Sequence, residues 1–271
     1  MTQRLARTAT AATQRPWRWA LLGALFGALA VTLLWAPARW LAWGLHQASQ
    51  GRVMLHSPRG TVWQGSAQLA LSGGAGSLDR QALPGRLAWA LRPSSQGLAL
   101  RLQADCCMRE PLQLQLNAGL GQWGLQLNNH QSEWPAALLT GLGAPWNTLQ
   151  PQGQLQLRTE ALQLQWAAGR LQWQGQAVLT AQDMSSRLST LRPMGSYQVQ
   201  VSSPAQGSAT PQVQLSTLSG PLQLSGQGQW LGDRLRFSGQ AVAAEGQEDN
   251  LSNLLNIIGR RDGTRSLLSL G

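Results

Sequence analysis

The sequence contains no lysine, and the other residues that do chemistry are scarce: three His, two Cys and 11 Asp plus Glu among 271 residues. Without lysine there is no phosphate-binding glycine loop of the kind that ends in Lys. His46, His56 and His130 do not lie at metal-ligand spacing from one another or from Cys and carboxylates. No pair of acids stands out for acid–base catalysis. We therefore expect a protein that is not an enzyme and uses no cofactor and no metal.

The chain is also short of negative charge in its first part, which explains most of its formal net charge of +10. Seven arginines and no acidic residue precede Asp79, whereas arginine only slightly exceeds Asp plus Glu beyond it. A nucleic-acid-binding protein needs a basic patch on its folded domain, with aromatic or arginine stacking positions to match. This distribution does not provide one, so no nucleic-acid partner is expected.

One uncharged apolar run is present, at residues 19–38, and its length is close to the roughly 20 residues of a membrane-spanning helix. Tryptophans bracket the run, as is typical of the two membrane interfaces. The residues in question are Trp17, Trp19, Trp35, Trp40 and Trp43, preceded by Arg4, Arg7, Arg15 and Arg18. By the positive-inside rule we predict a cytoplasmic basic tail (1–18), a single transmembrane helix (19–38) and an exported remainder.

Two alternatives concern this region. Ala36-Pro37-Ala38 loosely matches the cleavage site of a signal peptide, but Pro37 within the site and the length of the run favour an anchor. Residues 39–50 place Trp40, Leu41 and Leu45 on one helical face. This pattern predicts a juxtamembrane helix at the outer interface, or equally the first packing segment of the folded domain.

The rest of the chain, residues 51–271, alternates leucine with polar residues, as in "PLQLQLNAGLGQWGLQLN" at 111–128. Successive side chains of a strand point to opposite faces, so this alternation predicts half-buried strands. Gly, Pro, Ser and Asn separate the runs, which favours antiparallel neighbours joined by turns. The pattern recurs at 62–71, 85–91, 97–103, 153–157, 162–166, 171–179, 197–201, 213–215, 222–230 and 235–241.

Two short helices are expected within this β-rich domain. Residues 134–147 have Pro135 suited to a first helical turn and Gly141 or Gly143 suited to end it. Residues 248–258 place Leu251, Leu254, Leu255 and Ile258 on one face, and Gly259 follows as a stop. We expect the second helix to cover an open end or edge of the sheet, with Arg260 and Arg261 near its carboxyl end.

Cys106 and Cys107 are the only thiols, and they are adjacent. An oxidising compartment permits pairing, but neighbouring cysteines lie closer together than a disulfide prefers. Three alternatives stay open: reduced or buried thiols, a vicinal disulfide, and an intermolecular bond.

Several blocks of the sequence resemble protein N of the bacterial type II secretion system. They are "GTVWQG" (60–65), "LTGLGAPWNTLQPQGQLQL" (139–157), "SSRLSTLRPMGSY" (185–197), "LSGPLQLSGQGQW" (218–230) and "NLLNIIGRRDG" (253–263). The resemblance implies an accessory inner-membrane protein with a β-rich periplasmic domain, associated with the inner-membrane platform and the outer-membrane secretin. It offers no catalytic residues. The family is also similar to the AsmA-like group, whose curved sheets form lipid-lined grooves.

From pattern and resemblance together we predict a mainly β fold: a curved, taco-like antiparallel half-pipe with short capping helices, leucine and tryptophan on its inner face. An ordinary filled β-sandwich is the alternative. The residues expected to matter for interaction or structure are Gly60, Trp63, Gly65, Trp146, Gly153, Arg260 and Arg261. The expected function is that of a secretion-system component, with lipid binding or transfer in the sheet groove as the alternative.

Overall fold

The structure is a computed structural model that describes residues 17–119, 121–167, 170–203, 210–231 and 234–271. It divides the chain into two compact units, Met1–Ala36 and Pro37–Gly271. The predicted basic tail, 1–18, lies almost wholly outside the described residues.

The described part of the first unit is the helix α1, Trp17–Leu34. Its large apolar side chains are exposed, from Trp19 at 78% to Leu21 at 54%. The helix ends four residues before the predicted boundary at 38, and Pro37 lies in extended backbone, in keeping with the low helical preference of residues that precede proline. Among the described residues, no helix combines the length and apolar character needed to cross a membrane. The prediction of a transmembrane helix is therefore not supported.

The second unit begins with the helix α2, Ala38–Ala48, which packs against β1 (Val53–Gly60). Ala38 is 1% exposed and belongs to a core cluster with Ala67 and Trp89. The helix α2 thus packs on the folded domain, and its location at a membrane interface stays a prediction.

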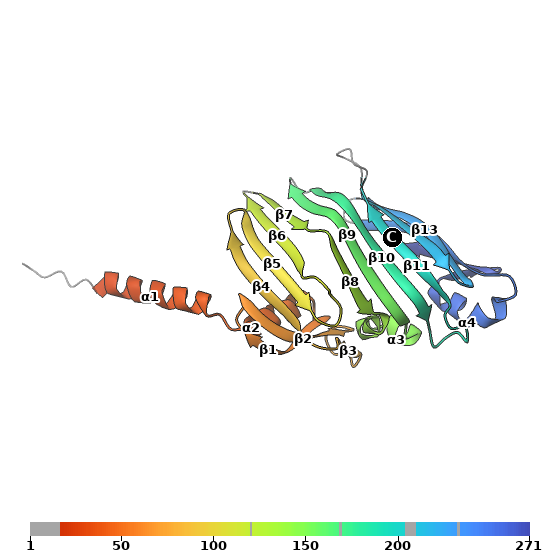
Figure 1. The fold of residues 1–271 in the computed structure, drawn as a ribbon, viewed down its shortest axis with the longest axis horizontal. Helices are drawn as coiled ribbons and strands as arrows, with labels where there is room; N and C mark the ends of the chain where they lie inside the picture. The colour runs from red at the N-terminus through yellow and green to blue at the C-terminus, as the bar shows by residue number, and fades with distance from the viewer. Residues whose placement is uncertain (1–16, 120, 168–169, 204–209, 232–233) are drawn as a thin grey trace, which may run out of the picture. The chain divides into compact units, whose positions relative to one another are not determined.

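One antiparallel sheet of 16 strands makes up most of the second unit (Figure 1). After β1, the strands are β2 (Gln64–Ser72), β3 (Arg80–Ala82), β4 (Leu87–Ser94), β5 (Gly97–Ala104), β6 (Leu112–Gly119), β7 (Gln122–Leu127), β8 (His130–Pro135), β9 (Gln152–Ala167), β10 (Arg170–Ser185), β11 (Gly195–Ser202), β12 (Gln212–Ser219), β13 (Leu222–Leu231), β14 (Arg234–Ala243), β15 (Arg260–Asp262) and β16 (Arg265–Leu270). Their order is β1-β2-β4-β5-β6-β7-β9-β10-β11-β12-β13-β14-β16-β15, with β3 beside β2 and β8 beside β9. The mainly β, antiparallel prediction is confirmed. The described strands form a single open sheet, so the alternative of two stacked sheets is wrong.

The strand register collects the apolar residues on one face across the sheet. Residues directly opposite each other in an antiparallel pair project to the same face, and leucine meets leucine or valine at most of these positions. Examples are Leu91–Leu100, Leu100–Leu114, Leu114–Leu127, Leu125–Leu164, Leu157–Leu179, Leu179–Val199 and Val199–Leu215. Glutamines align on the other face in the same way, as in Gln115–Gln126, Gln126–Gln163 and Gln163–Gln174. One face is therefore apolar, and the other carries polar side chains, mainly glutamine, with arginines such as Arg101 and Arg236 among them.

A bulge in β9 keeps this apolar face continuous. The apolar residues of β9 fall at odd positions up to Leu157 and at even positions from Leu162 onward. The register shifts between them, and Ala161 adopts a φ of +45°. Its amide donates a hydrogen bond to Asn129 Oδ1 at 2.8 Å. One extra residue in a strand reverses the phase of the pleat, so two runs that are out of phase in the sequence still share one face.

Helices cover one end of the apolar face, and Figure 1 shows α2, α3 and α4 along the same end of the strands. The helix α4, Glu248–Ile258, buries Leu251, Leu254 and Leu255 in the largest core cluster, as its spacing predicts. A second cluster includes Leu138, from the 3-10 helix η1, Ala136–Leu142. The short helix predicted within 134–147, with Pro135 at its start and Gly141 or Gly143 at its end, is this 3-10 helix. A further short helix, α3, Trp146–Leu149, follows Gly143 and Pro145.

Candidate interaction surfaces

Gly60 and Gly65 form the narrow base of the β1–β2 turn. Gly60 has a φ of +87°, and a Cβ atom there would collide with the main-chain oxygen of Gln64. A Cβ atom at Gly65 would lie 2.6 Å from Cζ2 of Trp89. Both positions thus require glycine for the close approach of backbone and indole.

Trp63 lies at the tip of the same turn and is half-buried. Its carbonyl oxygen accepts a hydrogen bond from the amide of Leu91 at 2.6 Å. Next to it, the Trp89 indole N–H donates to the carbonyl oxygens of Thr61 and Val62 at 3.2 and 3.0 Å. The turn is therefore tied to β4 by main-chain and indole hydrogen bonds.

Gly153 lies in β9 opposite a second bulge, where Asp183 has a φ of +49°. Gly153 itself has a φ of +130°, and a Cβ atom would approach the Gln182 oxygen to 2.6 Å. Trp146 begins α3 and is 36% exposed. Gly153 is thus constrained by the backbone, whereas Trp146 is partly accessible.

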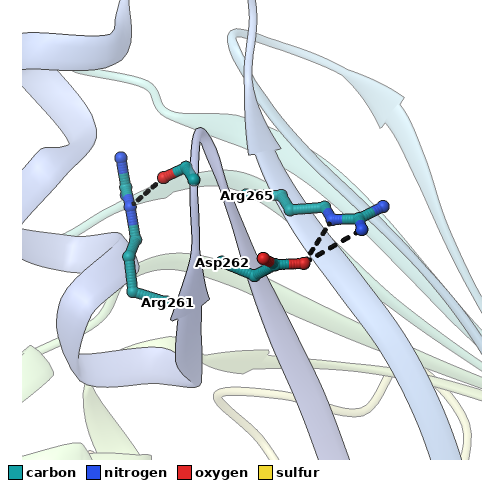
Figure 2. A network of polar contacts seen from close by, with 4 residues as sticks. Arg261, Asp262 and Arg265 are labelled. Atoms are coloured by element: carbon teal, nitrogen blue, oxygen red, sulfur yellow. Dashed lines mark hydrogen bonds and ion pairs between the residues drawn. The ribbon is translucent and has the colours of Figure 1, made fainter.

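Arg260 and Arg261 lie in β15, the last strand of the sheet order, rather than in the last turn of α4. Figure 2 shows the surroundings: Arg261 Nε donates to the Gly263 carbonyl oxygen at 2.8 Å, and Arg265 forms an ion pair with Asp262 at 2.9 Å. All three residues of β15 are exposed. The two arginines therefore belong to a solvent-facing hairpin at one edge of the sheet.

The structure does not bring the seven nominated residues into one site. They lie at the β1–β2 turn, in α3 and the middle strand β9, and in the edge strand β15. The three glycines have backbone reasons for their identity, and the arginines form the most accessible group.

The uncovered part of the apolar face is a surface that the list of nominated residues missed. Trp123 and Trp166 face each other across β7 and β9 with ring centroids 6.2 Å apart and planes 16° apart. They are 50% and 37% exposed, and Leu116 and Leu179 are each 37% exposed. The same alternation that predicts the strands carries this signal, since both tryptophans occupy leucine positions of the pattern.

A polar cleft of about 690 Å³ is lined by the loop 105–110 together with residues of β8 and β9. The structure joins the sulfurs of Cys106 and Cys107, whose Cα atoms are 3.8 Å apart. The Cys107 carbonyl oxygen accepts a hydrogen bond from the Glu133 amide at 2.8 Å, which attaches the loop to β8. Arginine and carboxylate side chains both line the cleft, namely Arg109, Arg158, Asp105, Glu110, Glu133 and Glu160. The cleft suits a polar ligand rather than an acyl chain.

Among the residues that the structure describes, two buried ionisable side chains lack a hydrogen-bond partner at one atom: His130 at Nε2 and Tyr197 at its hydroxyl oxygen. Burial lowers the pKa of His130 below its ordinary value of 6.5, against a smaller upward effect of Glu110. Burial raises the pKa of Tyr197. Desolvation thus favours the neutral form of both His130 and Tyr197.

Within the described ranges, no group of three or more His, Cys, Asp or Glu side chains could hold a metal ion.

Comparison with protein families gives a match over most of the chain. The family model described as type II secretion system (T2SS), protein N, matches residues 51–267, which include nearly the whole sheet. No curated protein and no solved structure matches the chain.

Proposed function

The chain belongs to the protein N family of the type II secretion system, and from this membership we propose that its sheet domain is a non-enzymatic binding module of the secretion machine. The observation that carries the proposal is the family match over residues 51–267, which covers most of the folded unit Pro37–Gly271. In the proposal the domain lies in the periplasm and contacts the inner-membrane platform, the outer-membrane secretin, or both.

The polar face of the sheet supports this role. Exposed glutamines on it include Gln113, Gln165, Gln214 and Gln240. Amide side chains donate and accept hydrogen bonds without the desolvation cost of charges. Such a face can take part in an interface that forms and dissociates during export.

Site-specific photo-cross-linking tests the proposal. A photoreactive amino acid is placed at Gln113, Gln165, Gln214 or Gln240 in cells that carry the secretion system, and the adducts are identified by mass spectrometry. We expect adducts with other secretion components, lost in cells from which those components are deleted. Normal secretion after deletion of this chain, together with no adduct at any position, would contradict the proposal.

We further propose that residues 17–34 attach the domain to the inner membrane, with the amino terminus in the cytoplasm. Support comes from the exposed apolar side chains of α1 and from the arginines that precede it in the sequence. Extraction with alkaline carbonate distinguishes a peripheral from an embedded segment, and reporter fusions before residue 17 and after residue 50 report its topology. A full-length chain that is recovered soluble in the periplasm would exclude attachment.

A second candidate function is the binding of an acyl chain on the uncovered apolar face. The specific observation is the exposure of Trp123, Trp166, Leu116 and Leu179 on that face. Mass spectrometry of lipids that copurify with residues 37–271 in the absence of detergent tests this candidate, with Trp123→Gln as the matched variant. A lipid-free domain that still cross-links to secretion components would remove it.

A further inference from the structure

The two ends of the open sheet are protected unequally against the addition of another strand. At the β1 end, the ladder is interrupted between His56 and Arg59, Ser57 adopts a φ of +47°, and Pro58 lies within the strand. The helix α2 also packs against β1. Bulges, prolines and covering helices are the devices by which sheet edges are closed. The β1 edge is therefore closed in three ways.

Within the described residues, the edge strand at the opposite end has neither a bulge nor a proline, and the contacts of the helix α4 are divided among β14, β15 and β16. The strand β15 pairs through Arg260, Arg261 and Asp262 with β16, and no described strand lies on its outer side. Asp262 and Arg265 flank a two-residue turn, and residues in that position exchange both main-chain hydrogen bonds. Because the direction alternates along a strand, the amide and carbonyl groups of Arg261 then point outward. The outer edge of β15 thus offers main-chain groups to an incoming strand.

Charge and shortness protect this edge. Arg260 and Arg261 precede Asp262 in β15, and Figure 2 shows the Asp262 carboxylate facing Arg265 while Arg261 points to the other side of the strand. The Arg265 guanidinium donates two hydrogen bonds to the Asp262 carboxylate, and Arg261 Nε donates one to the Gly263 carbonyl oxygen. If two copies of the chain paired through β15, the arginines of one copy would face those of the other, and like-charge repulsion disfavours this pairing. An acidic partner would be attracted instead.

We propose that the outer edge of β15 is a docking site for an extended acidic segment of another protein, which adds to the sheet as a further strand. Main-chain hydrogen bonds to β15 supply the pairing, and carboxylates beside Arg260 and Arg261 supply the selectivity. That the partner is a secretion component rests on the proposed function, but the binding itself does not.

Peptide binding to the full-length chain in mild detergent tests the site. The probe is a ten-residue peptide that alternates valine and glutamate. Its controls are a valine–lysine peptide and a valine–glutamate peptide with a central proline, which keeps the charge but cannot form a continuous strand. We expect saturable binding of the first peptide only, with slower hydrogen exchange at the outward-pointing amide of Arg261.

Two arginine pairs allow a matched comparison. Arg260→Gln with Arg261→Gln should weaken binding about tenfold, since two exposed ion pairs are lost. Arg234→Gln with Arg236→Gln removes the same charge from exposed positions of β14 and should leave binding unchanged. Arg260→Glu with Arg261→Glu should favour the lysine peptide instead.

Three results would overturn the site: equal binding of the proline-containing peptide, equal loss in both glutamine variants, or self-association of the chain through β15 in place of peptide binding. A failure here leaves the secretion and cross-linking experiments interpretable, because those do not depend on β15.

Discussion

The contact between α4 and the apolar face can be tested by replacing Leu255 with alanine. Leu255 is 0% exposed and packs in the cluster that contains Leu222, Ala241 and Leu251. The substitution removes apolar atoms from a closed core and leaves a cavity, which costs about 2 to 5 kcal/mol for a buried leucine. Because domains are stable by only about 5 to 15 kcal/mol, this is a large share of the free energy of unfolding.

Urea and thermal unfolding of residues 37–271, followed by tryptophan fluorescence, measure the effect. In a domain of this size 1 kcal/mol corresponds to about 2 to 4 °C, so a loss near 3 kcal/mol lowers Tm by roughly 10 °C. The matched control is Ile257→Ala on the same helix, where the side chain is 45% exposed. Alanine favours the helix, so this variant should change stability by less than about 1 kcal/mol.

Equal shifts for Leu255→Ala and Ile257→Ala would refute the reasoning, since they would mean that α4 does not bury one face against the sheet. A small shift for both would mean that the helix contributes little to the folded domain.

Three further outcomes follow from individual residues. Gly153→Ala should destabilise the domain by about 1 to 2 kcal/mol or more, because its φ of +130° and the 2.6 Å approach to a carbonyl oxygen disfavour a side chain; Gly124→Ala, where the nearest atom is 3.6 Å away, is the control in the same denaturation assay. Maleimide labelling of the oxidised protein should modify neither Cys106 nor Cys107 before reduction and both after it, because their sulfurs are bonded; labelling without a reductant would contradict the bond. His130 has its pKa lowered in the folded state from 6.5, so the unfolded chain takes up the proton more readily and stability should fall as pH drops below about 6.5; in pH-dependent unfolding, His130→Gln should lose this part of the slope.

The division of the sheet into an apolar and a polar face could be predicted from the sequence, because the alternation of leucine with polar residues is a local property. Leu112, Leu114 and Leu116 share a face in any extended conformation, and the structure keeps them there. The covering face of α4 follows equally from the spacing of its leucines. The sequence does not predict that β9 is one continuous strand. Its apolar residues switch from odd to even positions around Ala161, and such a switch resembles the end of one strand and the start of another.

The positions of the candidate surfaces depend on long-range pairing, which a single sequence does not specify. The run that holds Arg260 and Arg261 looks like the end of a helix, because the preceding leucines are helical. In the structure Gly259 lies against the carbonyl oxygen of Leu267, and the chain turns there into an edge strand. Similarly, the exposure of Trp123 and Trp166 results from which part of the apolar face the helices cover, which no local pattern encodes.

The strand order places the closed and the open edge at opposite ends of one continuous sheet. The path from β1 to β15 contains 14 strands, and neighbouring strands lie about 4.8 Å apart, so the two edges are separated by roughly 60 Å along the sheet. The apolar amino-terminal segment precedes the closed edge in the chain. The docking proposed for β15 therefore concerns the end of the sheet order opposite to the strand that follows α2 in the chain, and the attachment proposed for residues 17–34 uses a different part of the sequence.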